Sequence, residues 1–296
     1  MRMSRFLSQW RPDILHAHTS KAHTHLWLTR KLLKRAPPLV VSRRVTFPVS
    51  RGIWGYLKYR TGVAHYVPIS QAAARTLRDV NVSEEMMTVV PSGVDVESFE
   101  QSQADENLLG RWGIERGNFV IGTVAAFEKE KGYNVLLGAA RKVIGECPEC
   151  RFILLGAGRL RRSFETSIEH MELGGKIIID GVSASLERIL PLFDCYVLSS
   201  RDEGLSTALI AALASGLPVI ASDVGGIPEV LSSGCGILVP PDDAEGLAAA
   251  ILTLVRDDGL RRMLALRGRR RAWEFDIGKT VERTLEVYEH VLGQRF

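Results

Sequence analysis

Short apolar runs alternate with stretches of helical periodicity along the whole chain of 296 residues. The runs are Asp13–Ala17, Pro38–Ser42, His65–Ser70, Met87–Val90, Val120–Val124, Phe152–Leu155, Lys176–Ile179, Cys195–Ser199, Pro218–Ser222 and Gly236–Val239. Strands that alternate with helices pair in parallel, because each helix crosses back over the sheet before the next strand begins. Runs that are apolar throughout suit strands covered on both faces. The pattern therefore predicts an α/β fold with doubly wound, parallel sheets.

A turn-rich segment, Pro91–Asp95, and a polar stretch after it separate two sets of apolar runs. A chain of this length makes one large domain or two of ordinary size. We expect a Rossmann-like N-terminal domain over 1–98 and a Rossmann-like C-terminal domain over 99–275. The last helical stretch, 276–296, is expected to pack back toward the N-terminal domain.

The net charge of +4 is mild and argues against a dedicated nucleic-acid binder. No apolar run reaches the length of a transmembrane helix, and the N-terminus lacks the apolar core of a signal peptide. We therefore expect a cytoplasmic protein. Two arginine clusters suit either solvated helix faces or peripheral contact with anionic lipid head groups at the inner membrane face. They are Arg159, Arg161 and Arg162, and Arg267, Arg269, Arg270 and Arg271.

The four cysteines give no clear metal or redox motif. Cys147 and Cys150 have C-x-x-C spacing, but no second such pair or histidine pair completes a zinc site. A redox pair would open a helix after a strand, whereas this pair precedes a strand. We interpret both residues as incidental turn cysteines.

Ligands of doubly wound sheets bind beyond the carboxyl ends of the strands, so the residues after each strand matter most. Ser199–Thr207 joins a strand to a helix start whose free N–H groups suit a phosphate, and Gly204 permits close approach. Glu203 would repel phosphate but can accept hydrogen bonds from sugar hydroxyls. Lys131 follows another strand and could reach a diphosphate. Each feature alone is explained as well by a helix cap or a surface lysine.

Two further loops follow strands. Gly156-Ala-Gly158 lacks the third glycine of the dinucleotide fingerprint, since Arg161 stands at that place, which disfavours a dehydrogenase. Asp180 and Gly181 end another strand, and Gly181 with Val182 would border a base pocket.

Taken in order, these segments resemble the large retaining glycosyltransferase family four, also called glycosyl transferases group 1. The resemblance runs from about Pro12 to the end and is strongest over residues 120–240. The motifs that carry it are Val-Ala-Ala-Phe-x-x-x-Lys-Gly, Leu-Leu-Gly-x-Gly, Leu-Ser-Ser-Arg-x-Glu-Gly-Leu and Ala-Ser-Gly-Leu-Pro-Val-Ile-Ala-Ser-Asp-Val-Gly-Gly-Ile-Pro-Glu. The resemblance implies a GT-B architecture, in which two Rossmann-like domains face a cleft. Pro91–Asp95 is similar to the interdomain connection of that family.

The family also implies roles for single residues. Glu203 matches the first glutamate of the E-x7-E motif, which contacts the transferred sugar. His18 matches a histidine that lines the sugar site from the N-terminal domain, with His16 as the less favoured alternative. The remaining expected donor-binding residues are Lys131, which matches the lysine of the donor diphosphate, Gly156, Gly181, Val182, Gly204, Leu205, Ser206 and Thr207.

Three departures from the family pattern stand out. Ala211 occupies the position of the second glutamate of E-x7-E, which holds the nucleotide ribose. Ala126 stands where an arginine usually follows the first strand of the C-terminal domain. The His-x-His segment begins at Asp13, so we expect the first βα units of the N-terminal domain to be missing and that domain to be incomplete.

The resemblance implies transfer of a sugar from a nucleotide-diphosphate donor with retention of configuration, no cofactor and no essential metal. Two alternatives remain open. The chain could be a degenerate or truncated homologue that binds nucleotide weakly or serves as a non-catalytic subunit. A two-domain epimerase shares the architecture but needs acid and base carboxylates that the His18 region does not clearly offer.

The sugar or lipid-linked acceptor is not evident from the sequence, and a role in cell-surface polysaccharide or lipopolysaccharide assembly follows from analogy. A basic and aromatic stretch suits either a helix with inward-packed aromatic rings or contact with a membrane or lipid-linked acceptor. It comprises Arg43, Arg44, Trp54, Tyr56, Lys58, Tyr59 and Arg60.

Overall fold

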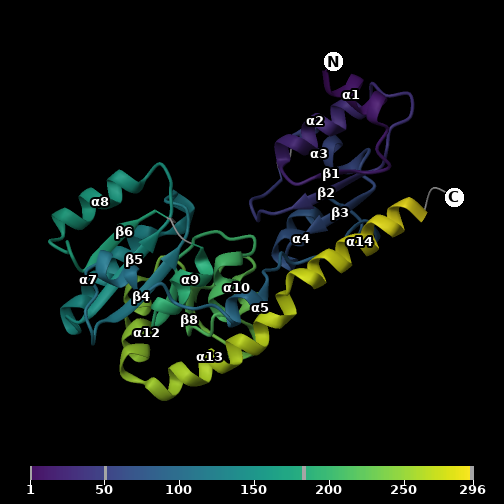
Figure 1. Cartoon of the computed structure of the whole chain (residues 1–296). Coiled ribbons are helices and arrows are strands. Elements are labelled where there is room, and N and C mark those ends of the chain that lie inside the picture. The colour runs from purple at the N-terminus through teal and green to yellow at the C-terminus, as the bar shows by residue number, and fades with distance from the viewer. Residues whose placement is uncertain (1, 50–51, 182–184, 294–296) are drawn as a thin grey trace. The chain divides into compact units, whose positions relative to one another are not determined.

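The computed structural model describes residues 2–49, 52–181 and 185–293. The chain divides into two compact units (Figure 1). Unit 1 comprises Met1–Ser92 with Ile277–Phe296, and unit 2 comprises Gly93–Asp276. Each unit has its own parallel sheet, so the predicted α/β class with parallel sheets is confirmed.

Unit 1 is built on a three-stranded parallel sheet in the order β1-β2-β3. Its elements are α1 (Arg2–Trp10), β1 (Leu15–Ala17), α2 (Ser20–Arg30), β2 (Leu39–Arg43), α3 (Ile53–Arg60), β3 (His65–Pro68), α4 (Gln71–Arg78), the 3-10 turn η1 (Glu84–Met86) and α14 (Ile277–Gly293). All five residues of β2 are buried because this strand lies between the other two and is covered on both faces. Val287 and Val291 of α14 pack on Val40 and Val67 of this sheet.

Unit 2 contains a six-stranded parallel sheet in the order β6-β5-β4-β7-β8-β9. Its strands are β4 (Phe119–Val124), β5 (Cys150–Leu155), β6 (Ile177–Asp180), β7 (Cys195–Leu198), β8 (Val219–Ser222) and β9 (Ile237–Val239). Its α-helices are α5 (Val96–Glu100), α6 (Asn107–Arg111), α7 (Tyr133–Glu146), α8 (Arg161–His170), α9 (Leu186–Ile189), α10 (Thr207–Ala214), α11 (Ile227–Val230), α12 (Ala244–Arg256) and α13 (Asp258–Ala272). The 3-10 turns are η2 (Lys129–Lys131), η3 (Leu190–Leu192), η4 (Ser232–Gly234) and η5 (Trp273–Phe275).

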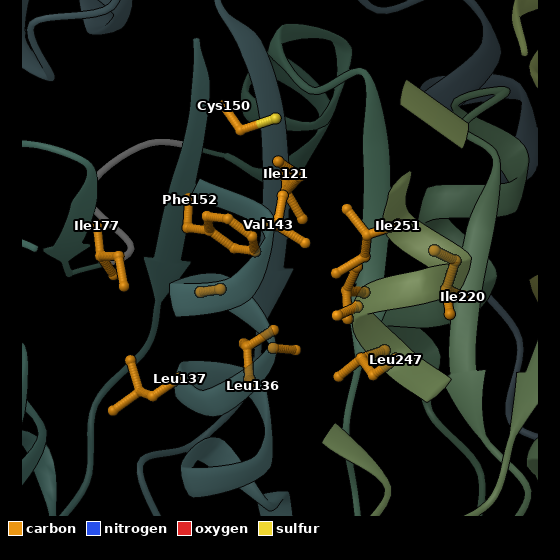
Figure 2. Packing of buried hydrophobic residues seen from close by; sticks show 14 of the residues in the cluster. Ile121, Leu136, Leu137, Val143, Cys150, Phe152, Ile177, Ile220, Leu247 and Ile251 are labelled. Atoms are coloured by element: carbon orange, nitrogen blue, oxygen red, sulfur yellow. The ribbon is translucent and has the colours of Figure 1, made fainter. Parts of the chain in front are cut away.

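The apolar strands of unit 2 are buried because helices cover both faces of the sheet. Val143 of α7 and Ile251 of α12 pack with Phe152 of β5 in the core drawn in Figure 2. Elsewhere in unit 2, Gly268 of α13 lies against Leu213 of α10, where a larger residue would collide with the leucine side chain. These layers match the helical and apolar periodicity of the sequence.

The strand order of unit 2 reverses between β4 and β7. The chain moves outward from β4 through β5 to β6, then returns to β7 and continues to β9 in the other direction. At such a switch point, the loops after the two central strands diverge and leave a crevice at their carboxyl ends. The segments after β4 and β7 are therefore where this unit is expected to bind a ligand.

No described helix of the chain is both long enough and apolar enough to cross a membrane.

Candidate active site

Backbone hydrogen bonds tie together the loops at the carboxyl edge of the unit 2 sheet. The Gly156 N–H donates to the Asp180 carbonyl at 3.2 Å, and the Phe127 N–H donates to the Ala157 carbonyl at 2.9 Å. Across the switch point, the Arg201 N–H donates to the Glu130 carbonyl at 2.7 Å. The loops after β4, β5, β6 and β7 thus form one connected surface.

Lys131 is positioned by the turn that ends η2. Gly132 follows it with a φ of 62°, in the left-handed region that glycine adopts without strain. A Cβ atom on Gly132 would overlap the carbonyl oxygen of Ser199, so this glycine also permits close packing of the loops after β4 and β7. The Ser199 hydroxyl donates to the Lys131 carbonyl at 3.0 Å. The ammonium group of Lys131 is therefore carried on a fixed backbone.

Lys131 and Glu203, which lie 72 positions apart in the sequence, form an ion pair. The Lys131 Nζ donates to Glu203 Oε2 at 2.5 Å, and the Ser200 hydroxyl donates to the same oxygen at 3.3 Å. The exposed fractions of the two side chains are 22% and 12%, so the pair is largely shielded from water but still reachable by a ligand. The lysine thus has its charge balanced by a carboxylate that can also accept hydroxyl hydrogen bonds.

The Glu203 backbone is held from the other side by the turn after β8. The Gly226 N–H donates to the Glu203 carbonyl at 3.0 Å. Gly225 has a φ of 55°, and a Cβ atom there would overlap the same carbonyl oxygen. Gly225 is thus required by the close approach of the two loops.

The N-terminus of α10 lies directly after Glu203. The Ser206 hydroxyl caps the helix by accepting from the Leu209 N–H at 3.3 Å. Among the described residues, no acceptor is found for the N–H groups of Thr207 and Ala208, as is usual for a first helical turn. Gly204, Leu205 and Ser206 are buried and Thr207 is exposed. These amides and the helix dipole suit an anion next to Lys131.

The other two expected loops lie on the same edge, farther from the switch point. Gly156 packs its Cα against the Ala125 carbonyl, where a Cβ atom would overlap. Asp180 is engaged by Arg111 at 3.1 Å and by the indole N–H of Trp112 at 2.9 Å, and its carboxylate also accepts from the Gly181 N–H at 2.7 Å. Val182, which was expected beside Gly181, lies outside the described residues.

His18 belongs to unit 1 and lies in a chain of polar side chains. The Ser42 hydroxyl is 3.2 Å from His18 Nδ1 and 2.8 Å from His16 Nε2. His16 Nδ1 is in turn 2.6 Å from the Tyr288 hydroxyl on α14. One consistent arrangement has Tyr288 donating to His16, His16 donating to Ser42, and Ser42 donating to His18 Nδ1. This arrangement leaves the His18 Nε2–H as a donor, whereas the reverse arrangement leaves Nε2 as an acceptor.

Both histidines favour the neutral form. Burial, and then the nearby His18, lowers the pKa of His16 to about 4. Burial, and then the charge of Arg44, also lowers the pKa of His18. At neutral pH the exposed His18 is therefore a hydrogen-bonding group and carries no charge.

Two side chains in this cluster were missed in the sequence. Ser42 ends a strand predicted as buried, and nothing in its neighbours indicates a polar role. Tyr288 is separated from His16 by 272 positions, and only the packing of α14 on unit 1 brings them together. No local signal could have identified either contact.

The positions that depart from the family pattern offer no charge to a ligand. Ala211 is fully buried in α10, and Ala126 lies exposed in the loop after β4.

Cys147 and Cys150 are buried free thiols. Over residues 2–49, 52–181 and 185–293, no three His, Cys, Asp or Glu side chains lie close enough together to hold a metal ion.

Part of the basic and aromatic stretch packs inward. Lys58 donates to the Ser20 carbonyl at 3.0 Å, and Tyr59 is buried. Arg43 is also buried and donates to the Thr76 hydroxyl at 3.0 Å. Tyr56 faces outward, where Arg60 stacks on its ring. The inward-packing interpretation thus holds for Tyr59 and not for Tyr56.

Comparison with known proteins identifies the family of this chain. Residues 118–257 match the family model described as Glycosyl transferases group 1, and residues 1–98 match the model of Glycosyltransferase Family 4. The phosphatidyl-myo-inositol mannosyltransferase of Mycolicibacterium smegmatis is 30% identical over 292 residues, which cover 95% of this chain and 72% of that protein. The uncharacterized glycosyltransferase MJ1178 of Methanocaldococcus jannaschii is 28% identical over 66% of this chain, which spans 58% of that protein.

A solved structure with a similar fold is that of Anabaena Alr3699/HepE in complex with UDP. It has a TM-score of 0.85 and 20% sequence identity, and the match covers 98% of this chain and 81% of that one.

The two parallel-sheet units and the similarity to solved structures show a GT-B architecture with Rossmann-like domains. The chain belongs to glycosyltransferase family four, the glycosyl transferases group 1. The predicted family and fold class are therefore confirmed.

Proposed function

We propose that this chain transfers a sugar from a nucleotide-diphosphate donor to an acceptor with retention of anomeric configuration. One observation carries the proposal: a lysine, a carboxylate and two free helix amides meet at the switch point of unit 2. Lys131 and the amides suit the two phosphates, and Glu203 suits a sugar hydroxyl beside them. A nucleotide-diphosphate sugar presents both a diphosphate and sugar hydroxyl groups.

In the proposed reaction, the bond from the anomeric carbon to the diphosphate oxygen breaks first. Lys131 and the first-turn amides of α10 stabilise the negative charge that develops on the leaving diphosphate. The acceptor hydroxyl attacks from the same face and gives its proton to the leaving phosphate. Glu203 and His18 hold the sugar in position, so neither a protein nucleophile nor a metal ion is part of the proposal.

The acceptor class is proposed from the relatives. The Mycolicibacterium relative is named for mannosyl transfer to phosphatidyl-myo-inositol, and a Salmonella relative is named as a putative colanic acid biosynthesis glycosyltransferase. A lipid-linked or cell-surface glycan acceptor, met in the cytoplasm or at the inner membrane face, fits both names. The chain spans 46% to 76% of the length of these and similar relatives. The activities of the complete relatives are therefore proposals for this chain.

The proposal is tested by incubating the purified chain with UDP- and GDP-sugars and measuring released nucleoside diphosphate. One donor should turn over, and Lys131→Ala should abolish the release. Lys129→Ala is the matched control, because Lys129 lies exposed on the same turn, and it should leave the rate unchanged. A proton NMR spectrum of the glycoside product then reports whether the configuration is retained. Equal rates in the two lysine variants would contradict the assigned role.

A non-catalytic homologue is the second candidate. The buried Ala211 favours it, because this residue has no carboxylate for the ribose hydroxyls. A lost hydrogen bond to a charged group weakens binding by about 1.5–3 kcal/mol, or roughly 10- to 150-fold. Saturable UDP or GDP binding without turnover of any donor would support this candidate over the enzyme.

A further inference from the structure

A polar pocket lies in unit 2, outside the candidate active site. It is a cavity of about 430 Å³ between α13 and the turn that precedes β9. Its lining residues are Ser233, Cys235, Arg267, Arg270, Arg271 and Glu274. Small-molecule sites commonly have volumes of roughly 300–1,000 Å³, so this cavity has room for a small ligand.

The pocket lies on the opposite edge of the sheet from the candidate active site. Cys235 comes shortly before the first residue of β9, whereas Lys131 and Glu203 follow the last residues of β4 and β7. The strands of this sheet are parallel, so their amino and carboxyl ends lie at opposite edges. A ligand in the pocket would not touch the ion pair at the switch point.

Two arginines of the pocket are held by backbone carbonyls. Arg271 donates to the carbonyls of Glu229 at 2.6 Å and Val230 at 3.1 Å, and it pairs with Glu274. Arg267 donates to the Gly234 carbonyl at 3.3 Å. These contacts limit the freedom of both guanidinium groups before any ligand arrives. Less side-chain entropy is then lost on binding.

The charge of the pocket is not balanced. Three arginines and one glutamate line it, and that glutamate is already paired with Arg271. No hydrogen bond or ion pair of Arg270 is found among the described residues. The other arginine cluster differs, because Arg159 pairs with Glu128 and Arg161 with Glu165. Two uncompensated guanidinium groups in one cavity favour a multivalent oxyanion.

We propose that the pocket between α13 and the 232–235 turn binds a phosphate-bearing ligand at a site separate from the donor site. Arg267 and Arg270 supply the positive charge, and Arg271 holds the adjoining backbone in place. The ligand could be a free phosphorylated metabolite or the phosphate of a lipid head group. Both sources present phosphate oxygens to the arginines, and the experiments below distinguish them.

The first measurement titrates inorganic pyrophosphate into the full chain by calorimetry. Ser233 is exposed and has a φ of 65°, a conformation that asparagine and aspartate both tolerate. Ser233→Asp and Ser233→Asn therefore differ chiefly in charge, and the pair controls for folding. We expect the aspartate variant to bind pyrophosphate roughly tenfold more weakly than the asparagine variant.

A double variant tests the arginines directly. Arg267→Gln with Arg270→Gln should also weaken binding at least tenfold. The matched control is Arg116→Gln with Arg262→Gln, which removes the same charge at exposed positions outside the pocket, and it should bind as the wild type does. If Lys131→Ala abolishes pyrophosphate binding and the pocket variants do not, the phosphate occupies the donor site and the proposal is wrong.

Vesicle sedimentation identifies the source of the phosphate. If the ligand is a lipid head group, phosphatidylglycerol vesicles retain the Ser233→Asn variant and release the Ser233→Asp variant, while phosphatidylcholine vesicles retain neither. If the ligand is a free metabolite, the two variants differ in their affinity for pyrophosphate but behave alike toward both kinds of vesicle. Equal behaviour of both variants toward pyrophosphate and toward vesicles would overturn the proposal. Failure of donor turnover would leave these results unaffected, because the pocket variants leave Lys131 and Glu203 in place.

Discussion

Opposite effects on nucleotide binding are expected from the two halves of the Lys131–Glu203 pair. Lys131→Met removes the cation proposed to bind the diphosphate. A hydrogen bond to a charged group contributes about 1.5–3 kcal/mol, so UDP should bind roughly 10- to 150-fold more weakly. Glu203→Gln removes a carboxylate 2.5 Å from the same lysine and therefore near the incoming phosphate.

The size of the second effect follows from Coulomb's law. Two unit charges 4 Å apart repel by about 4 kcal/mol at an effective dielectric constant of about 20. The pair is partly reachable by water, which reduces this figure, so we expect Glu203→Gln to tighten UDP binding by roughly three- to tenfold. Transfer of sugar should nevertheless fall, because the carboxylate proposed to hold the sugar is gone.

Calorimetric titration of UDP and GDP into both variants and into Lys129→Met measures these changes. The control should bind as the wild type does, since Lys129 is exposed on the same turn. Weaker binding in both Lys131→Met and Glu203→Gln would show that Glu203 supports the nucleotide instead of repelling it. Unchanged binding in both would contradict the roles assigned to Lys131 and Glu203.

Three further outcomes are expected. Ser42→Ala should lower the transfer rate and leave UDP affinity in the wild-type range, because it frees His18 from its orienting hydroxyl; a matching loss of UDP affinity would contradict this. The unfolding free energy should fall as the pH drops from about 6.5 to 4, because the unfolded chain protonates first at His16, whose folded pKa is about 4. The loss of unfolding free energy is at most about 1.4 kcal/mol per pH unit and is smaller after solvent screening. Urea titrations should show that the unfolding free energy of His16→Gln depends less steeply on pH than that of the wild type. Gly225→Ala should weaken both folding and UDP binding, since its Cβ would overlap the Glu203 carbonyl and its φ of 55° costs about 1–2 kcal/mol for alanine; a wild-type melting temperature would count against that overlap.

The order of strands and helices in unit 2 could be predicted because each strand carries its own apolar signal. The loops after these strands could be identified for the same reason, since a parallel sheet gathers its carboxyl ends at one edge. The run Met87–Val90 shows where this reasoning fails. It forms a single bridge to Tyr66 and two backbone hydrogen bonds to β3, and not a separate strand. Pro68 ends β3 and has no N–H to extend the ladder.

Contacts between distant positions could not be predicted. Lys131 and Glu203 were expected at the same site, but their direct pairing depends on the geometry of two loops. The Tyr288 contact with His16 depends on α14 packing across unit 1, which no local pattern encodes. Sequence periodicity predicts the helices, the strands and the edges of the sheet, whereas side-chain partners depend on the three-dimensional fold.

Hydrogen–deuterium exchange with and without saturating UDP or GDP, whichever binds, tests the donor site directly. Exchange should slow at the amides of 204–208 and around Lys131, because the diphosphate would accept from the first turn of α10. Exchange at 232–235 and along α13 should change less. Saturable nucleotide binding with no slowing at 204–208 would contradict the assignment of the donor site.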